Sequence, residues 1–151
     1  MTVASALSTI TNSIAALVIT GVTIKDIDEI PQSASMLTPL LIPQPNDFVT
    51  DFAVTFQSFG SNGTAKMDMD YSLNYVYLHA EAGSGIGTFD VYSGLITKLS
   101  AIIVAILSND AITGLVDMQL GGIGNIGIIE DPSGNQYWGV LFSFRIKEFA
   151  Q

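Results

Sequence analysis

Two stretches of the chain carry apolar residues at the spacing of an amphipathic helix. In residues 2–19 the apolar positions, separated by serine and threonine, are Val3, Leu7, Ile10, Ile14 and Leu17. In residues 89–108 a wider apolar face is formed by Val91, Leu95, Leu99, Ile102, Ile103 and Ile106. The sequence therefore predicts one helix that ends near Gly21. It predicts a second helix that Thr88 can cap and that ends at Asn109 and Asp110.

Two later stretches alternate apolar and polar residues, which is the period of a β-strand with one buried face. In the first, around residues 48–57, Phe52, Val54 and Phe56 alternate with Asp51, Thr55 and Gln57. A Gly/Asn-rich turn, "FGSNGTAK", leads to a longer strand, one face of which contains Met67, Met69, Tyr71, Leu73, Tyr75 and Tyr77. These strands are expected to form a β-hairpin. The first half of the opposite face is expected to be solvated and contains Lys66, Asp68, Asp70, Ser72 and Asn74.

A second hairpin is predicted from residues 122–130 and 136–148. In the turn "DPSGN", Pro132 sets the backbone and Gly134 or Asn135 can take a positive φ. One face of the last strand is apolar and comprises Trp138, Val140, Phe142, Phe144 and Ile146. The other face comprises Tyr137, Gly139, Ser143, Arg145 and Lys147. Residues 115–120 are expected to form a short strand or an extension of this hairpin.

The segment between the first helix and the first hairpin is irregular. "VTIKDIDEIP" is expected to be a short strand or extended segment closed by Pro31. The next stretch contains Pro39, Pro43 and Pro45, which exclude a regular helix and restrict any strand to a sheet edge. Together, these elements predict a single α+β domain over residues 1–151, with a mostly antiparallel sheet covered by two helices.

Composition narrows the possible functions. A chain of 151 residues is expected to form one domain, and without cysteine it has neither disulfides nor thiolate ligands for zinc. Five Lys and Arg against 14 Asp and Glu give a net charge of −9, which repels phosphate backbones and argues against specific DNA or RNA binding. Because only 13% of residues are charged and 48% are hydrophobic, some apolar surface is expected to contact a partner.

A membrane location is not expected. The longest apolar run, "LSAIIVAIL" at 99–107, is less than half of the roughly 20 residues that a spanning helix needs. No Lys or Arg precedes position 25, so a secretory signal would lack its basic region. The chain is expected to be soluble and cytoplasmic where it is made.

Two glycine-rich stretches raise the question of phosphate binding. Gly122, Gly124 and Gly127 have G-x-G-x-x-G spacing, but the turn "DPSGN" follows where a dinucleotide-binding loop needs a helix. A strand is therefore expected there. "GSGIGTF", at 83–89, does join a strand to a helix, but it lacks a Gly-Lys-Ser/Thr ending and is flanked by Glu81 and Asp90. A surface loop is expected.

Other candidate groups do not combine into a site. Asp68 and Asp70 could be half of a hard-cation site, to which the nearby turn adds Asn62 and carbonyl oxygens, but a solvated strand edge is the expected outcome. His79, the single histidine, lies near Glu81 but no G-x-S-x-G motif is present. Trp138 is explained by core packing. No catalytic, cofactor-binding or metal-binding residue is therefore assigned, and an enzyme is not expected.

The order of elements resembles the small tail-completion proteins of long-tailed bacteriophages, the tail terminators in particular. The resemblance covers nearly the whole chain. Besides the two helices, it rests on the segments "GVTIKDIDEIP", "LTPLLIPQP", "MDYSLNYVYLHAEAGSG" and "DPSGNQYWGVLFSFRIKEF".

This resemblance implies a structural virion protein that assembles in the host cytoplasm into a ring, typically of six copies. The ring would cap the tail tube, stop its growth and contact both the tail tube protein and the head-side connector protein. Its acidic bore would let DNA pass without specific binding. The working elements would be the loops at 32–46, 59–65 and 81–88.

Two alternatives stay open. Another head-tail connector or a tail tube component would share the acidic, ring-forming character. A small ligand-binding or enzymatic α+β domain would instead need a polar pocket around Tyr75, Tyr77, His79 and Glu81.

Overall fold

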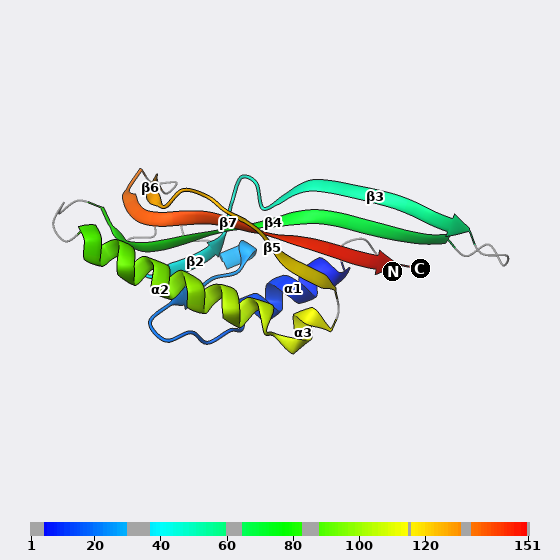
Figure 1. The fold of residues 1–151 in the computed structure, drawn as a ribbon, viewed down its shortest axis with the longest axis horizontal. Coiled ribbons are helices and arrows are strands. Elements are labelled where there is room, and N and C mark those ends of the chain that lie inside the picture. Colours follow the sequence, from blue (N-terminus) through cyan, green and yellow to red (C-terminus); the bar gives the residue numbers. More distant parts are fainter. Residues whose placement is uncertain are drawn as a thin grey trace.

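The residues that a computed structural model of the chain describes, 5–29, 37–59, 65–82, 88–114, 116–130 and 134–150, form one seven-stranded sheet with helices against one face (Figure 1). The α+β class, with a mostly antiparallel sheet and two main helices, is therefore confirmed. The strands are β1 (Thr23–Ile24), β2 (Leu40–Pro43), β3 (Val49–Phe59), β4 (Ala65–Glu81), β5 (Asp117–Ile123), β6 (Gly127–Glu130) and β7 (Gln136–Ala150). The helices are α1 (Ser5–Ala15), α2 (Thr88–Leu107) and the unpredicted short α3 (Asp110–Thr113), besides a 3₁₀ turn at Ile27–Glu29.

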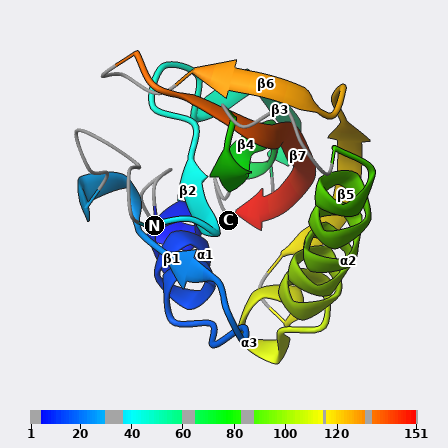
Figure 2. The same ribbon diagram turned by 90° about the vertical axis from the view of Figure 1, so that its left-hand side faces the viewer.

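Strands β4 and β7 form the centre of the sheet and are antiparallel along nearly their whole length. On the far side of β4, β2 pairs with one half of the strand and β3 with the other. On the far side of β7, β5 and β6 divide the strand in the same way. The predicted β3–β4 hairpin is confirmed. The second hairpin is confirmed for β6 and β7, but its predicted first strand, 122–130, is interrupted at 124–126, and residues 122 and 123 belong to β5. Figure 2 shows α1 below β2, and α2 on the side of the sheet where β5 lies.

The main core lies between the helices and one face of the sheet. The alternation in β4 and β7 is confirmed, since Tyr71, Leu73, Tyr75 and Tyr77 face the helices together with Val140, Phe142, Phe144 and Ile146. The predicted stripes of α1 and α2 are also buried there at Ile10, Ile14, Leu95, Leu99, Ile102 and Ile106. Val3 and the side chains of Phe56, Met67 and Val91 lie outside the described residues.

The first helix is shorter than predicted. It ends at Ala15 rather than near Gly21, and Val18 beyond it is 96% exposed. Residues 17–20 are Leu, Val, Ile and Thr, and the three β-branched side chains among them disfavour a helix. Gly21 has a φ of 76° and turns the chain into β1.

The placement of β2 corrects a second prediction. A strand with Pro39 and Pro43 at its ends was expected at a sheet edge, but β2 lies between β1 and β4. Strand β1 is parallel to β2 and so short that it pairs only with Leu40 and Leu41 among the described residues. The prolines lie beyond these partners, and the Pro39 carbonyl accepts a hydrogen bond from the amide of Thr23. No bond to β1 therefore needs the missing proline N–H groups.

The outer face of β4 is less solvated than predicted. Asp68 and Ser72 are buried, although Asp70 and Asn74 are partly exposed. Strand β4 has partners on both sides, so long side chains from β7 lean over its small polar residues. The Arg145 guanidinium, for example, donates a hydrogen bond to the Ser72 hydroxyl at 3.1 Å.

A second, smaller cluster covers the other end of this outer face. Tyr137, predicted on the polar side of the last strand, is buried there with Leu40, Ile42, Val76 and Leu78. The burial results from β2 and β6, which bring Leu37 and Ile129 against these side chains. The sheet thus has apolar contacts on both faces at this end.

At the opposite end the β3–β4 hairpin extends beyond the helices (Figure 1). We call residues 51–59 and 65–71 the arm. Phe52 stacks on Tyr71 with ring centroids 5.4 Å apart, and Val54 is opposite Met69. Both side chains therefore lie on the helix side of the sheet, yet Phe52 and Val54 are exposed.

We expect Gly139→Ala to lower the free energy of unfolding by about 1–3 kcal/mol, because the neighbouring strands leave no room for a β-carbon at this residue. A β-carbon at 139 would overlap the Tyr77 carbonyl oxygen and approach Ile129 and Leu78 to 3.2 Å. Gly122→Ala is the matched control, since nothing lies within 4 Å of its β-carbon. It should leave stability unchanged to within about 1 kcal/mol. Urea unfolding measures both variants, and equal effects would contradict the packing described here.

Candidate functional site

The G-x-G-x-x-G spacing does not form a phosphate-binding loop. Gly122 lies within β5 and Gly127 begins β6, so a strand follows where a helix would be required. The predicted turn is seen in part, since Gly134 has a φ of 91°, whereas Pro132 lies outside the described residues. Of the second glycine-rich stretch, residues 83–87 also lie outside them, and α2 begins at Thr88.

The two aspartates of β4 are not joined by further ligands. The described residues include no cluster of three or more His, Asp or Glu side chains that could hold a metal ion. Asp70 is opposite Lys147 of β7, so an ammonium-bearing residue occupies the neighbouring position on this face. Asn62 lies outside the described residues. The geometry therefore gives a cation no multi-carboxylate site at Asp68 and Asp70.

His79 lies at an irregularity in the β4–β7 register, between Leu78 and Ala80. Its Nδ1 is 2.7 Å from the Tyr77 hydroxyl, and its Nε2 lies 3.1 Å from where a β-carbon at Gly94 of α2 would be. The imidazole therefore lies against the helix. Burial, with the nearby Lys98 ammonium as a second cause, lowers the pKa of His79 below its ordinary 6.5.

Of the four residues that a ligand-binding pocket would need, Tyr77 and His79 are in contact, but Tyr75 and Glu81 do not join them. Tyr75 and Tyr77 are buried in the main core, and burial raises the pKa of both hydroxyls. Glu81 is opposite Tyr137, whose side chain packs in the cluster on the other face of the sheet. Glu81 is also exposed, so it is directed away from His79. Trp138 packs against the core, as predicted, and its ring also meets that of Tyr92 edge to face at 5.5 Å.

A buried polar pair not anticipated from the sequence lies at the base of the arm. The Tyr71 hydroxyl donates a hydrogen bond to the Glu148 carboxylate at 2.5 Å, and both residues are buried. Burial, followed by this hydrogen bond, raises the pKa of Tyr71. Met69 is opposite Glu148, and the Phe52 ring covers Tyr71. The pair is thus enclosed by apolar groups, an arrangement that fixes the arm but offers no access to a substrate.

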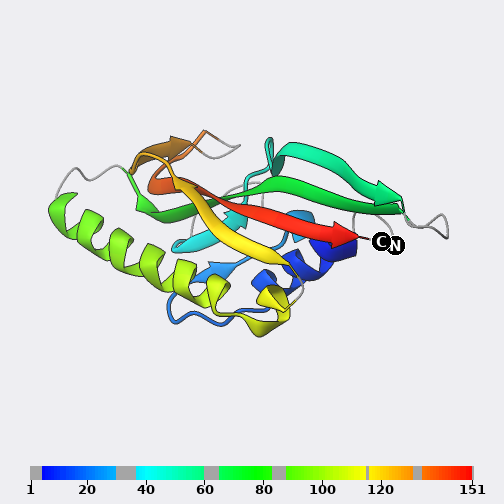
Figure 3. The same cartoon turned by 45° about the vertical axis from the view of Figure 1, so that its right-hand side comes forward.

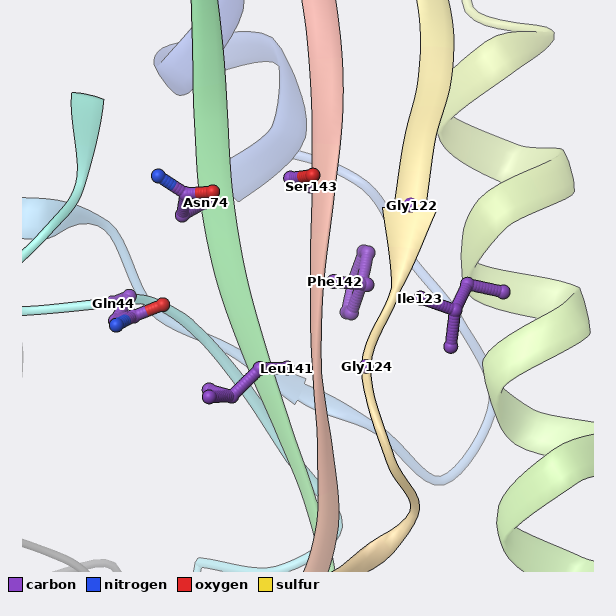
Figure 4. Close-up of a pocket in the computed structure, with 8 residues that line it drawn as sticks. All are labelled: Gln44, Asn74, Gly122, Ile123, Gly124, Leu141, Phe142 and Ser143. Atoms are coloured by element: carbon purple, nitrogen blue, oxygen red, sulfur yellow. The ribbon is translucent and has the colours of Figure 1, made fainter. Parts of the chain in front are cut away.

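A shallow depression of about 270 Å³ crosses the outer face of the sheet (Figure 4). Its lining is uncharged, with Gln44, Asn74 and Ser143 beside Leu141, Gly122 and Gly124. The Asn74 amide donates hydrogen bonds to the Asp47 carbonyl and the Thr50 hydroxyl, so it fixes the crossing from β2 to β3. The depression thus provides neither a charged group nor a reactive one.

The remaining candidate is a surface rather than a pocket. Within the described part of the chain, no strand pairs with the outer side of β3 or of β5. Leu120 and Ile123 of β5 are exposed, and Ile96 of α2 is exposed as well. We call Ile96, Leu120 and Ile123 the α2–β5 flank. Sequence reasoning missed it because Leu120 and Ile123 become surface residues only once β5 is placed at the edge, and no local pattern gives that position.

Comparison with known proteins adds no assignment, since no family model and no curated protein matches the chain. Of the helices that the structure describes, none is both long enough and apolar enough to cross a membrane.

We expect the single histidine to titrate with a midpoint below 6.5 by NMR. A lowered folded-state pKa means that below about pH 6.5 the unfolded chain binds a proton more readily. The contribution of His79 to stability is therefore present above pH 6.5 and is lost as the pH falls through the folded-state value. Lys98→Gln should raise the midpoint but leave it below 6.5, because burial is the larger cause. A midpoint at or above 6.5 in the unaltered protein would contradict this environment.

Proposed function

We propose that the chain is a non-enzymatic structural subunit of a ring that caps the tail tube of a long-tailed bacteriophage, a tail terminator or closely related neck ring protein. The proposal starts from the order of elements in the sequence. The observation that supports it best is a pair of open strand edges at opposite sides of one sheet. Among the described residues, one edge belongs to β3 and the other to β5.

The strand directions suit repeated head-to-tail association. Strands β3 and β7 run one way, and β4 and β5 run the other. A second copy in the same orientation would therefore place its β3 antiparallel to β5 of the first, with the helices of both copies on the same side of the joined sheet. Such a heterologous contact produces a closed ring when its rotation closes.

The charge of the chain is consistent with a channel for DNA. A ring of subunits that each carry −9 repels the phosphate backbone, so DNA would pass without binding. We assign the contacts with the tail tube protein and the head-side connector protein to the segments at 32–46, 59–65 and 81–88, as the resemblance implies. In the described residues no nucleophile, base and oxyanion donor lie together, which supports a structural role.

A tube subunit or another head-tail connector remains the second candidate. The open edges and the arm would serve stacked rings as well as a single ring, because an arm can reach from one ring to the next. The position in the particle separates the two roles: one ring at the head-proximal end of the tail for a terminator, and rings along the tail for a tube subunit.

We expect the purified protein, or the protein in assembled particles, to form closed rings of 16.0 kDa subunits. Size-exclusion chromatography with light scattering gives the mass, and electron microscopy of labelled particles gives the position. Particles assembled without the protein should carry tails of uncontrolled length. A strict monomer that never enters particles would overturn the proposal.

A further inference from the structure

Two exposed apolar surfaces lie at opposite edges of the sheet and on the same face of it. On the arm, Phe52 is 46% and Val54 42% exposed. On the α2–β5 flank, Leu120 is 39%, Ile123 46% and Ile96 49% exposed. Leu120 and Ile123 are opposite Phe144 and Phe142, both of which face the helices. Figure 3 shows β5 along the edge of the sheet above α2.

The orientation of α2 directs Ile96 toward the open edge. Gly94 faces His79 of β4, and the Lys98 ammonium donates a hydrogen bond to the Thr20 carbonyl at 2.6 Å, so this side of the helix lies against the body of the protein. Tyr92 and Ile96, one turn apart, lie on the other side, where Tyr92 meets Trp138. In Figure 4, Ile123 likewise projects toward α2.

The absence of charge on both surfaces favours a second copy of this chain as the occupant. In a protein of net charge −9, most contacts between two copies bring carboxylates together. Both apolar surfaces avoid this, because residues 52–65 and 118–129 contain no charged residue at all. From Val91 to Leu107 the single charged residue is Lys98, which is directed away from the flank.

We infer that the arm of one copy packs on the α2–β5 flank of the next, with Phe52 and Val54 against Ile96, Leu120 and Ile123. If β3 of one copy pairs with β5 of another and so continues the sheet, the arm of the first copy and the α2–β5 flank of the second meet on the same face. Each copy then gives its arm to one neighbour and its flank to the other. The inference rests on the self-association in the proposed function, but not on a position in a virus particle.

Charged substitutions test the two surfaces by light scattering on assembled protein. Val54→Glu and Ile123→Glu should each lower the assembled fraction at least tenfold. Leu141→Glu is the matched control, because Leu141 is 40% exposed on the opposite face of β7 and should leave assembly intact. Circular dichroism and thermal melting verify that each variant is folded.

Mixing the two charged variants tests the direction of the contact. The Val54→Glu chain keeps an intact flank and the Ile123→Glu chain keeps an intact arm. An equal mixture should therefore form dimers and no larger species, whereas each variant alone stays monomeric. A mixture that stays monomeric, or a Val54→Glu chain that still assembles, would overturn the inference.

Because the chain has no cysteine, single cysteines report the contact directly. A short bismaleimide should link a Val54→Cys chain to an Ile123→Cys chain at least tenfold more than it links a Val54→Cys chain to a Val18→Cys chain. Dimers of Val54→Cys alone would indicate a symmetric contact and overturn the inference. Failure of the unaltered protein to assemble, alone or in particles, counts against the proposed function. Assembly that survives both charged substitutions counts against these surfaces alone.

Discussion

The antiparallel pairing of β4 with β7 determines where every other part of the chain can lie. These are the two longest strands of the described sheet, and each is flanked on its other side by two shorter strands. Their register places buried tyrosines of β4 beside buried aromatic residues of β7, as with Tyr75 and Phe142. A shift by one residue would move this whole set to the outer face, so the register is strongly specified. The helices follow, since α1 and α2 bury their apolar stripes on the aromatic face.

The parts of the fold that were predictable are those in which one side of an element is buried along its length. The alternation of β7 and the stripe of α2 required no knowledge of their partners. The order of the strands in the sheet was not predictable in the same way, because it depends on residues far apart in the sequence. Tyr137 is buried because β6 lies beside it, and Asp68 is buried because β7 lies beside β4. Val18 is exposed because α1 ends at Ala15. The separation of Glu81 from His79 was likewise visible only once the two residues were placed on different faces of the sheet.

The surface of the protein divides into charged and uncharged regions in a way that composition alone conceals. A net charge of −9 describes the whole chain, yet both strands with an open edge contain long uncharged stretches. Natural proteins usually protect open edges with charges or bulges. Here β3 has bulges, one next to Asp51 at a φ of 54°, and β5 has one between Leu120 and Gly122. These irregularities limit unspecific strand pairing and leave the side chains as the main source of specificity.

The connectivity of the central pair has a consequence for folding. Strand β4 is separated from β7 along the chain by α2, α3, β5 and β6, so β7 emerges from the ribosome well after β4. Until then, β4 can pair with β3 but has no partner on its other side, and its tyrosines stay exposed to solvent. Pairing between segments far apart in sequence is slow, because loop closure must precede the contacts that offset its entropy. The β4–β7 pair can therefore form only after β7 is synthesised, whereas the local β3–β4 hairpin can form earlier.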